Sequence, residues 1–405
     1  MIKLTVIILA AVGGIYGVVL NILQHRSANN PTPQSVSDVF DAETYAKWKH
    51  YSAVNSVTDI FFSVLTCICT LVLLGTDAYS AFALLFPSGA IMQFLSVVIV
   101  ETAVGTVFGI VRSYIKTMVI EEKYGFNRST MKTYIFDRIR GVIFEFVLSF
   151  CLVYLLYTIH SRMGDWMILL FTVLLFVIML VASFLYPVFS RIGNKFTPLE
   201  DGELKDRLME LLTKHGYKVK AIEVMDASRR TTKLNAYFTG YGKMKTIVLF
   251  DNLINAMTPD EICAVFAHEL GHGLHKDVLK RQMLNIGNLL IMSLVVWFAV
   301  REPALHTAFG FGGVNYGFGY VLAGIGLGLI QPITGMIMNA YSRKAEYRAD
   351  KQAVKEGYGD AMVTALKKLA KENFAHLAPS KINVVLEYSH PPLSDRIDHI
   401  HSAQK

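Results

Sequence analysis

Long apolar runs dominate the pattern of hydrophobic and polar positions along this chain of 405 residues. A helix of roughly 20 apolar residues crosses the hydrocarbon core of a bilayer. We predict seven such helices, at about Ile2–Leu23, Val57–Leu74, Ala90–Val111, Gly141–His160, Trp166–Phe189, Leu284–Val300 and Phe318–Ala340. The first run could instead be a cleaved signal peptide, but it is long and no clear small-residue cleavage site follows it.

The pattern changes between the fifth and sixth runs, where polar positions become frequent. Glu203–Lys214 has the periodicity of an amphipathic helix. Ala221–Met225 and Thr246–Phe250 are rich in β-branched residues between turn signals, which predicts two strands. We interpret Asn235–Gly240 as an edge strand that ends at a glycine turn, although its periodicity fits an ordinary core strand equally well.

The composition supports a membrane protein, because 53% of the residues are hydrophobic and only 18% are charged. The mean hydropathy is +0.40. With seven spans, all of the 39 Lys and Arg residues except Lys3, Arg162 and Arg301 fall on one side of the membrane. The positive-inside rule makes that side cytoplasmic, even when the long 190–283 segment is left out. The net charge of +7 therefore indicates topology and contact with anionic lipid, and we find no nucleic-acid motif.

Candidate chemistry first appears in the stretch 264–273, which contains the pattern H-E-x-x-H. Thr258, Pro259 and Glu261 have the spacing of a helix start with a capping box. His268 and His272 then lie four apart on one face of the helix, where two imidazoles can hold one Zn²⁺. Glu269 could accept the proton of a water molecule that the ion activates.

A second stretch, 341–350, supplies the missing ligand. A catalytic zinc site takes three protein ligands and keeps one position open, and two histidines with one glutamate are a known set. Glu346 is our candidate for the third ligand. Asp350 lies one turn further on and could accept the free N–H of a ligand histidine. Alternatively, Glu346 is a solvated charge among the basic residues of its helix.

These observations predict a mainly α-helical, polytopic membrane protein with about seven transmembrane helices and a cytoplasmic-side α+β domain that carries the zinc site. We divide the chain into 1–189, with five membrane helices and cytoplasmic loops, and 190–283, the soluble catalytic segment. Helices six and seven lie in 284–340, and 341–405 completes the catalytic domain. The predicted spans contain Asp59, Glu101 and Glu145, which together suggest an internal polar cavity.

Several motifs, in order along the chain, resemble those of the type I CAAX prenyl proteases. These are integral-membrane zinc metallopeptidases that trim C-terminally prenylated proteins. The stretches are VIEEKYGFN (119–127), NKFTPL (194–199), NAYFTG (235–240), IVLFD (247–251), HELGH (268–272), YSRKAEYRAD (341–350) and SHPPLSDR (389–396). The resemblance implies seven helices around a large water-filled chamber, capped by a zinc domain of the gluzincin type.

The resemblance also implies roles for particular residues. It implies His268, His272 and Glu346 as zinc ligands and Glu269 as general base. It places His390 and Arg396 at the site, where they stabilise the oxyanion or bind substrate. Asn235, Ala236 and Tyr237 would line the cleft and bind the peptide, whereas His275 matches no ligand of the family.

Three functions remain in competition. The first is a zinc endopeptidase that cuts after a prenylated cysteine, with a prenylated C-terminal peptide as its partner. The second is a membrane quality-control metalloprotease of the HtpX type, which has fewer spans. The third is a transporter with a structural zinc, but such a site should have four protein ligands. We expect an integral multi-pass protein, in the endoplasmic reticulum membrane of a eukaryote or the inner membrane of a bacterium.

Overall fold

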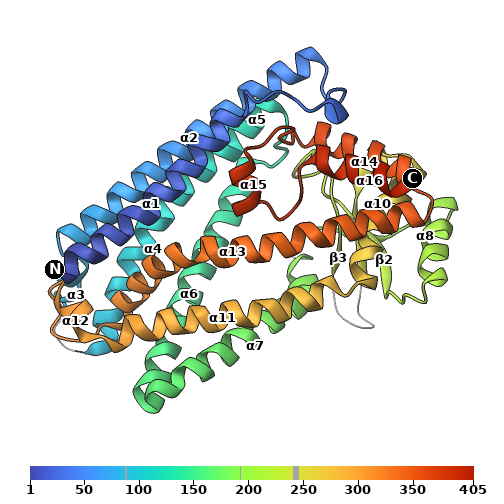
Figure 1. Cartoon of the computed structure of the whole chain (residues 1–405). Coiled ribbons are helices and arrows are strands. Elements are labelled where there is room, and N and C mark those ends of the chain that lie inside the picture. Colours follow the sequence, from blue (N-terminus) through green and yellow to red (C-terminus); the bar gives the residue numbers. More distant parts are fainter. Residues whose placement is uncertain (87–88, 192, 240–245) are drawn as a thin grey trace.

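The computed structural model describes residues 1–86, 89–191, 193–239 and 246–405, and beyond the backbone it says nothing of the Phe238 and Thr239 side chains. Long helices diverge from one end of the molecule, where the N-terminus lies, towards a mixed domain at the other end (Figure 1). The long helices are α1 (Ile2–Ser27), α2 (Ala42–Gly75), α4 (Ala90–Tyr114), α6 (Met131–Met163), α7 (Met167–Phe189), α11 (Asp277–Arg301) and α13 (Tyr316–Lys355).

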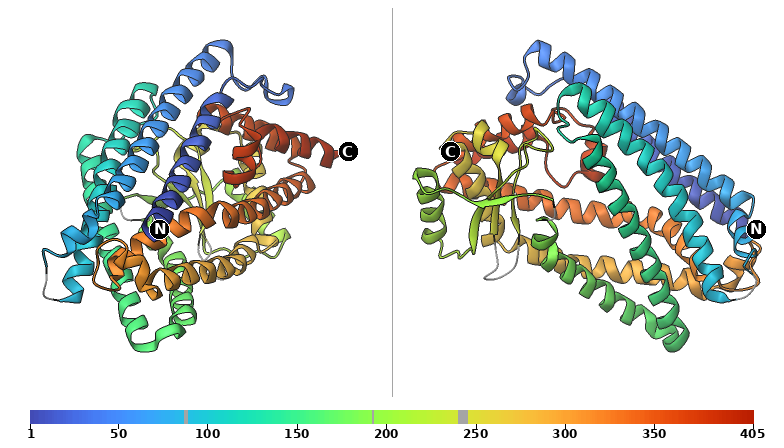
Figure 2. Two further views of the ribbon diagram at one scale, coloured as in Figure 1. Left: turned by 60° about the vertical axis from the view of Figure 1, so that its left-hand side comes forward. Right: turned by 180° about the vertical axis from the view of Figure 1, so that it is seen from behind.

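These long helices correspond one to one with the seven predicted spans. Among the described residues, six stretches are long and apolar enough to cross a membrane, and one of them, Met131–Phe189, contains both α6 and α7. The two helices form a hairpin whose turn lies far from the sheet, whereas the end of α7 lies beside the sheet (Figure 2). The predicted class, a mainly helical multi-pass membrane protein, is confirmed. The starts are less accurate, because α2 begins at Ala42 rather than at Val57.

Short elements connect the long helices. They are η1 (Gln34–Val36), α3 (Ala78–Ala83), η2 (a π-helix, Ile115–Glu121), α5 (Glu122–Tyr124), η3 (Gly164–Trp166) and α12 (Pro303–Thr307). The mixed domain contains β1 (Phe196–Pro198), α8 (Glu203–Lys214), β2 (Ala221–Met225), β3 (Ala236–Thr239), β4 (Thr246–Phe250), α9 (Asp251–Ala256), α10 (Pro259–Leu274), α14 (Gly359–Glu372), α15 (Lys381–Glu387) and α16 (Leu393–Gln404).

A four-stranded sheet in the order β1-β2-β4-β3 forms one layer of the mixed domain. β2 and β4 are parallel, whereas β1 and β3 are antiparallel to their neighbours. Ile247 and Leu249 of β4 pack against Cys263 and Phe266 of α10, which covers one face of the sheet. Within the described residues β3 is an edge strand, as predicted. The glycine turn expected at Gly240 lies outside the described residues.

The long helices surround a cavity of about 920 Å³ that all seven of them line. Of the three acidic residues predicted inside the spans, Glu101 lines this cavity and accepts a hydrogen bond from the hydroxyl of Tyr79. The expectation was wrong for the other two. Asp59 pairs instead with Arg112 and Lys116, at 2.7 and 2.8 Å. Glu145 lies exposed on α6. The cavity is therefore lined by one of the three carboxylates, and most of its other lining residues are apolar.

Candidate metal centre

Helix α10 carries the two histidines and begins as its sequence predicts. The Thr258 hydroxyl accepts from the Glu261 backbone N–H, and the Glu261 carboxylate accepts from the Thr258 N–H, at 3.4 and 2.8 Å. Lys368 of α14 pairs with Glu261 at 2.6 Å, which ties the start of α10 to the C-terminal part of the domain. The helix then runs through the buried centre of the domain. Its first turn is thus held from two sides.

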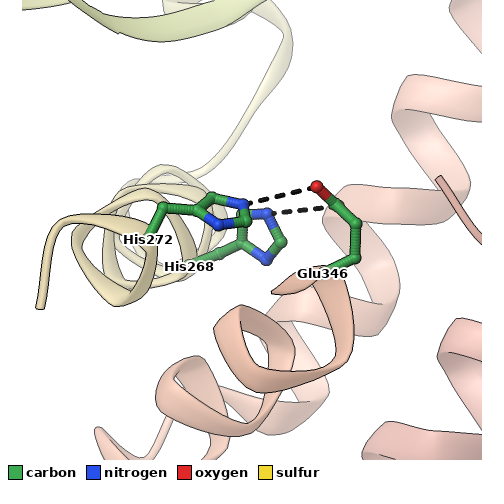
Figure 3. A group of neighbouring side chains, drawn as sticks. All are labelled: His268, His272 and Glu346. Atoms are coloured by element: carbon green, nitrogen blue, oxygen red, sulfur yellow. Dashed lines mark ion pairs between the residues drawn. The ribbon is translucent and has the colours of Figure 1, made fainter. Parts of the chain in front are cut away.

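The side chains of His268, His272 and Glu346 converge between α10 and α13 (Figure 3). One ligand atom from each lies within 4.8 Å of the others. His268 Nε2 is 3.6 Å from Glu346 Oε2, and His272 Nε2 is 3.3 Å from Glu346 Oε1. The two imidazole rings are perpendicular, with centroids 4.9 Å apart. Two histidines four residues apart on α10 and one glutamate on α13 therefore form one cluster.

Two carboxylates hold the histidines so that both Nε2 atoms face Glu346. The His268 Nδ1–H donates to Asp350 Oδ1 at 2.9 Å, and the His272 Nδ1–H donates to Asp277 Oδ2 at 3.1 Å. Because each Nδ1 carries the proton, each Nε2 keeps its lone pair for a metal ion. Asp350 thus lies where the sequence predicted it.

Asp277 was not predicted from the sequence. It begins α11 directly after Lys276, whose positive φ of 55° turns the chain back towards α10. Its other oxygen accepts from Arg348 at 2.6 Å and from the Tyr341 hydroxyl at 3.1 Å. Asp277 lies five residues after His272, and that spacing alone does not place a carboxylate beside an imidazole. The sequence feature that bears on Asp277 is the 341–350 motif, which contains the two residues that donate to it, Tyr341 and Arg348.

The cluster fits a divalent metal ion. Glu346 is 6% exposed, and its buried Oε2 accepts no hydrogen bond among the described residues. Burial lowers the pKa of His272, but the hydrogen bond and charge of Glu346 outweigh it and raise that pKa to about 9. The site therefore favours positive charge beside the imidazole. Two imidazole nitrogens and one carboxylate are a donor set that suits zinc.

Close packing at Gly271 brings α10 and α13 together. A Cβ at this position would lie 3.0 Å from Ala349 Cα and 3.0 Å from Gln352 Cβ. Ala349 lies between Glu346 and Asp350 on α13, so this contact sets how near the two carboxylates come to the histidines. The glycine inside the motif is therefore needed for the interhelical distance.

Arg396 of α16 holds Asp350 from the far side. Its Nε and Nη2 donate to the two carboxylate oxygens at 2.9 and 2.6 Å, and Asp350 is fully buried. Its Nη1 lies 3.4 Å from Glu346 Oε2. His390 Nε2 lies 3.4 Å from Glu346 Oε1, on an exposed side chain. Both residues thus lie at the cluster, and His390 is the one open to solvent.

Glu269 and His275 differ in their surroundings. Glu269 adjoins His268 on α10, outside the cluster of ligand atoms, and burial raises the pKa of its carboxyl. The His275 ring donates to the Gly271 carbonyl at 2.7 Å, at the end of its own helix. A carboxylate beside the cluster can exchange a proton with a bound water molecule, whereas His275 is engaged elsewhere.

Asn235, Ala236 and Tyr237 lie at the free edge of the sheet. The Asn235 carbonyl accepts from the Phe250 N–H at 3.1 Å. Because antiparallel pairs alternate, the Ala236 N–H and C=O then point away from β4. The Ala236 N–H donates to the Asn235 side-chain oxygen at 2.9 Å. A peptide that adds to this edge would therefore have to displace the Asn235 side chain before it could accept a hydrogen bond from the Ala236 N–H.

Comparisons with known proteins agree with this architecture. Residues 198–404 match peptidase family M48, and residues 21–191 match the CAAX prenyl protease N-terminal region of five membrane helices. CAAX prenyl protease 1 of Saccharomyces cerevisiae is 31% identical over 396 residues, which cover 90% of this chain and 87% of the relative. A homolog of CAAX prenyl protease 1 from Arabidopsis thaliana is 32% identical, with 72% of this chain and 70% of the relative covered.

A solved structure shows the same fold. The crystal structure of S. mikatae Ste24p is 28% identical, has a TM-score of 0.91 and covers 99% of each chain. The agreement extends over both the membrane helices and the mixed domain. This chain belongs to peptidase family M48 and to the CAAX prenyl protease 1 family within it, and is a metalloprotease held in the membrane by several helices.

Proposed function

We propose that this protein is a zinc-dependent endopeptidase that cleaves prenylated CAAX-type C-terminal peptides after the prenylated cysteine. The observation that carries the proposal is the convergence of His268, His272 and Glu346 beside Glu269. The N-terminal match supports the substrate class, because residues 21–191 match the membrane region of CAAX prenyl proteases. The yeast and plant relatives are named for this activity.

The proposed mechanism assigns one role to each side chain. Zinc held by His268, His272 and Glu346 would supply a Lewis acid that lowers the pKa of water and polarises the scissile carbonyl. Glu269 accepts the proton from the attacking water and passes it to the leaving amine. Asp350 and Asp277 hold the imidazoles in the orientation and tautomer that leave each Nε2 for the ion. No protein side chain forms a bond to the substrate in this scheme.

His390 and Arg396 would stabilise the negative charge that develops on the carbonyl oxygen. Arg396 has two donor atoms engaged by Asp350, and its Nη1 is the atom that faces Glu346. His390 is exposed, and its Nε2 points at the same carboxylate. Donors that are already positioned stabilise a transition state without reorganisation. We therefore assign the larger oxyanion role to His390 and a mainly positioning role to Arg396.

The substrate peptide would bind as an additional strand along β3. Main-chain hydrogen bonds to an exposed sheet edge give affinity without demanding a particular sequence. Ala236 presents its carbonyl at that edge, and Asn235 would release the Ala236 amide when the peptide arrives. Tyr237 would contact the peptide from the other face of the strand.

We further propose that the zinc site lies on the cytoplasmic side of the endoplasmic reticulum membrane. The Lys and Arg distribution supports the sidedness, and the eukaryotic sources of the yeast and plant relatives support the organelle. The same topology underlies the division of the chain at 189, 283 and 340. In it, 190–283 and 341–405 form the catalytic part together.

The HtpX-type alternative is disfavoured by the N-terminal match, which covers 21–191. The transporter alternative is disfavoured because the cluster offers three protein ligands and a neighbouring base. The test is cleavage of a farnesylated CAAX peptide by the purified protein, with the unprenylated peptide as control. Efficient cleavage of the farnesylated peptide alone supports the proposal, and equal cleavage of both favours the quality-control protease.

A further inference from the structure

We propose that an aromatic pocket between the end of α7 and the sheet binds the isoprenoid chain of the substrate. The inference rests on the proposed function and names the subsite that would recognise the lipid. The pocket has a volume of about 590 Å³ and is separate from the cavity between the membrane helices. That size is typical of sites for small organic ligands.

Four of the eight residues that line the pocket are aromatic, and the lining comes from the end of α7, the chain that follows it and the sheet. Tyr186 and Phe189 contribute from the last turn of α7, and Tyr237 and Phe250 from the sheet. The rings of Tyr186 and Tyr237 lie 6.1 Å apart, and those of Tyr237 and Phe250 lie 6.3 Å apart. Asn235 lines the pocket at the free edge, and the remaining lining residues are Ser190, Asn194 and Met225. The pocket therefore adjoins the strand where we place the peptide.

The pocket lies on the face of the sheet opposite α10. Ile247 and Leu249 point to α10, so their neighbours in β4 point to the other face. Tyr237 is paired with Val248 of β4, which puts its ring on that second face. The metal cluster and the pocket thus lie on opposite faces of the same sheet, and β3 is the edge from which both are accessible.

An added strand would present its side chains to both faces. Successive side chains in a strand alternate, so the two residues that flank the scissile bond point in opposite directions. One of them faces α10, and its neighbour faces the pocket. In a peptide cut after a prenylated cysteine, these residues are the lipidated cysteine and the residue that follows it.

The position of the pocket selects the lipid rather than the following residue. It opens at the end of α7, a membrane helix whose Phe189 side chain is 54% exposed. A chain that leaves the bilayer beside α7 reaches the pocket directly. Within the described part of the chain, the large cavity is lined by no residue of β3, so it does not adjoin the strand where we place the peptide. Burial in the pocket removes apolar area from water at about 25 cal/mol per Å².

The test compares two peptides that differ only at the cysteine, one with a farnesyl and one with a methyl thioether. The variants are Tyr186→Ala and Phe189→Ala, and the control is Phe184→Ala. Phe184 is equally exposed on α7 but does not line the pocket. We expect each pocket variant to raise KM for the farnesyl peptide about tenfold, as expected for one lost aromatic contact.

The same variants should leave kcat for the farnesyl peptide and both constants for the methyl peptide unchanged. Metal content and the melting temperature, measured on the same samples, show whether a variant is folded. The control should behave as the unmodified protein does. A variant that only lowers the stability of the fold should change the kinetic constants for both peptides. A rise in KM for the farnesyl peptide alone is therefore not expected from such a defect.

Two outcomes overturn the inference. If folded pocket variants keep the full preference for farnesyl, the lipid binds elsewhere. If instead they change KM between two farnesyl peptides that differ only in the residue after the cysteine, the pocket holds that side chain. Both results leave the proposed function intact. Failure of the unmodified protein to distinguish the two peptides would remove the proposed function and the inference together.

Discussion

Asp277 and Asp350 show how much single carboxylates contribute to the metal centre. Each accepts the Nδ1–H of one histidine and is itself held by an arginine, Arg348 or Arg396. The two imidazoles therefore have matched supports that come from different helices. Both imidazoles would therefore present their Nε2 atoms to a bound ion in a fixed orientation.

Asp277→Asn should weaken zinc binding roughly 10- to 100-fold, because the amide cannot hold His272 with the same charge. We would measure zinc affinity by competition with a chelator. Asp398→Asn, an exposed carboxylate on α16, is the control and should bind zinc normally. Unchanged affinity in the first variant would mean that Asp277 does not orient the imidazole.

The members of the cluster could be predicted from the sequence because their spacing is local. His268 and His272 on one helix, and Glu346 and Asp350 on another, need only the helical period. Asp277 could not be predicted, since its position depends on the turn at Lys276. The pairing of Asp59 with Arg112 was also missed, because it depends on which faces of α2 and α4 meet.

At the scale of secondary structure elements, the site depends on how α10 meets α13. The helices themselves were predicted well, and α8, β2 and β4 have the expected bounds. β1 was missed because it has three residues and includes a proline. The distance between two helices cannot be predicted from periodicity. Between α10 and α13 it depends on the close contact at Gly271.

Gly271→Ala should cost about 1 to 3 kcal/mol of stability and most of the bound metal, because the added Cβ overpacks the α10–α13 contact. Gly287→Ala on α11 is the matched control, since a Cβ there meets nothing within 4 Å. Metal content and melting temperature would be measured for both. Normal metal content in the Gly271 variant would show that the helices have room to adjust.

The C-terminal segment is docked on α1 and α2 through a half-buried histidine. His376 Nδ1 accepts from the Ala378 N–H at 3.3 Å, so its Nε2–H donates to the Ser27 hydroxyl at 3.0 Å. The ring also packs edge-on against Trp48. Burial lowers the pKa of His376 from 6.5 to about 4. The docked state therefore requires the neutral ring.

The free energy of unfolding should consequently fall as pH drops below about 6.5. There His376 is protonated in the unfolded chain but stays neutral in the folded protein. The contribution is fully present above that pH and is lost progressively down to about pH 4. At pH 5 the loss is about 2 kcal/mol. Melting temperatures between pH 7.5 and 5 would show the slope. His376→Gln should flatten it and His401→Gln, on an exposed residue, should not; a slope unchanged in the first variant contradicts the assignment.

At the scale of the whole molecule, the mixed domain caps one end of the helices (Figure 1). The charge pattern predicts that this domain lies on the cytoplasmic side of the membrane, and that side stays a prediction. Asn127-Arg128-Ser129 has the form of a glycosylation sequon, but Asn127 is only 7% exposed and its side chain bonds to Glu122 and Ser129. Absence of a glycan there therefore reports burial as much as topology.

Cysteine labelling gives a cleaner test of orientation. In a background without the four natural cysteines, Lys220→Cys and Arg162→Cys place single thiols at exposed positions on opposite ends of the molecule. A membrane-impermeant maleimide added to sealed microsomes with their cytoplasmic face outward should label the first variant and spare the second. The reverse pattern would place the metal centre on the luminal side.

The central claim is that Glu269 acts as the base while His268, His272 and Glu346 hold the ion. Glu269→Gln keeps the size of the side chain and leaves the ligand atoms untouched. The direct measurement is zinc content and turnover of a farnesylated peptide on one purified sample of this variant. We expect full zinc occupancy and hydrolysis reduced by at least about a hundredfold, which is the lower end of the rate loss when a general base is removed. Substantial hydrolysis at full zinc occupancy would contradict it.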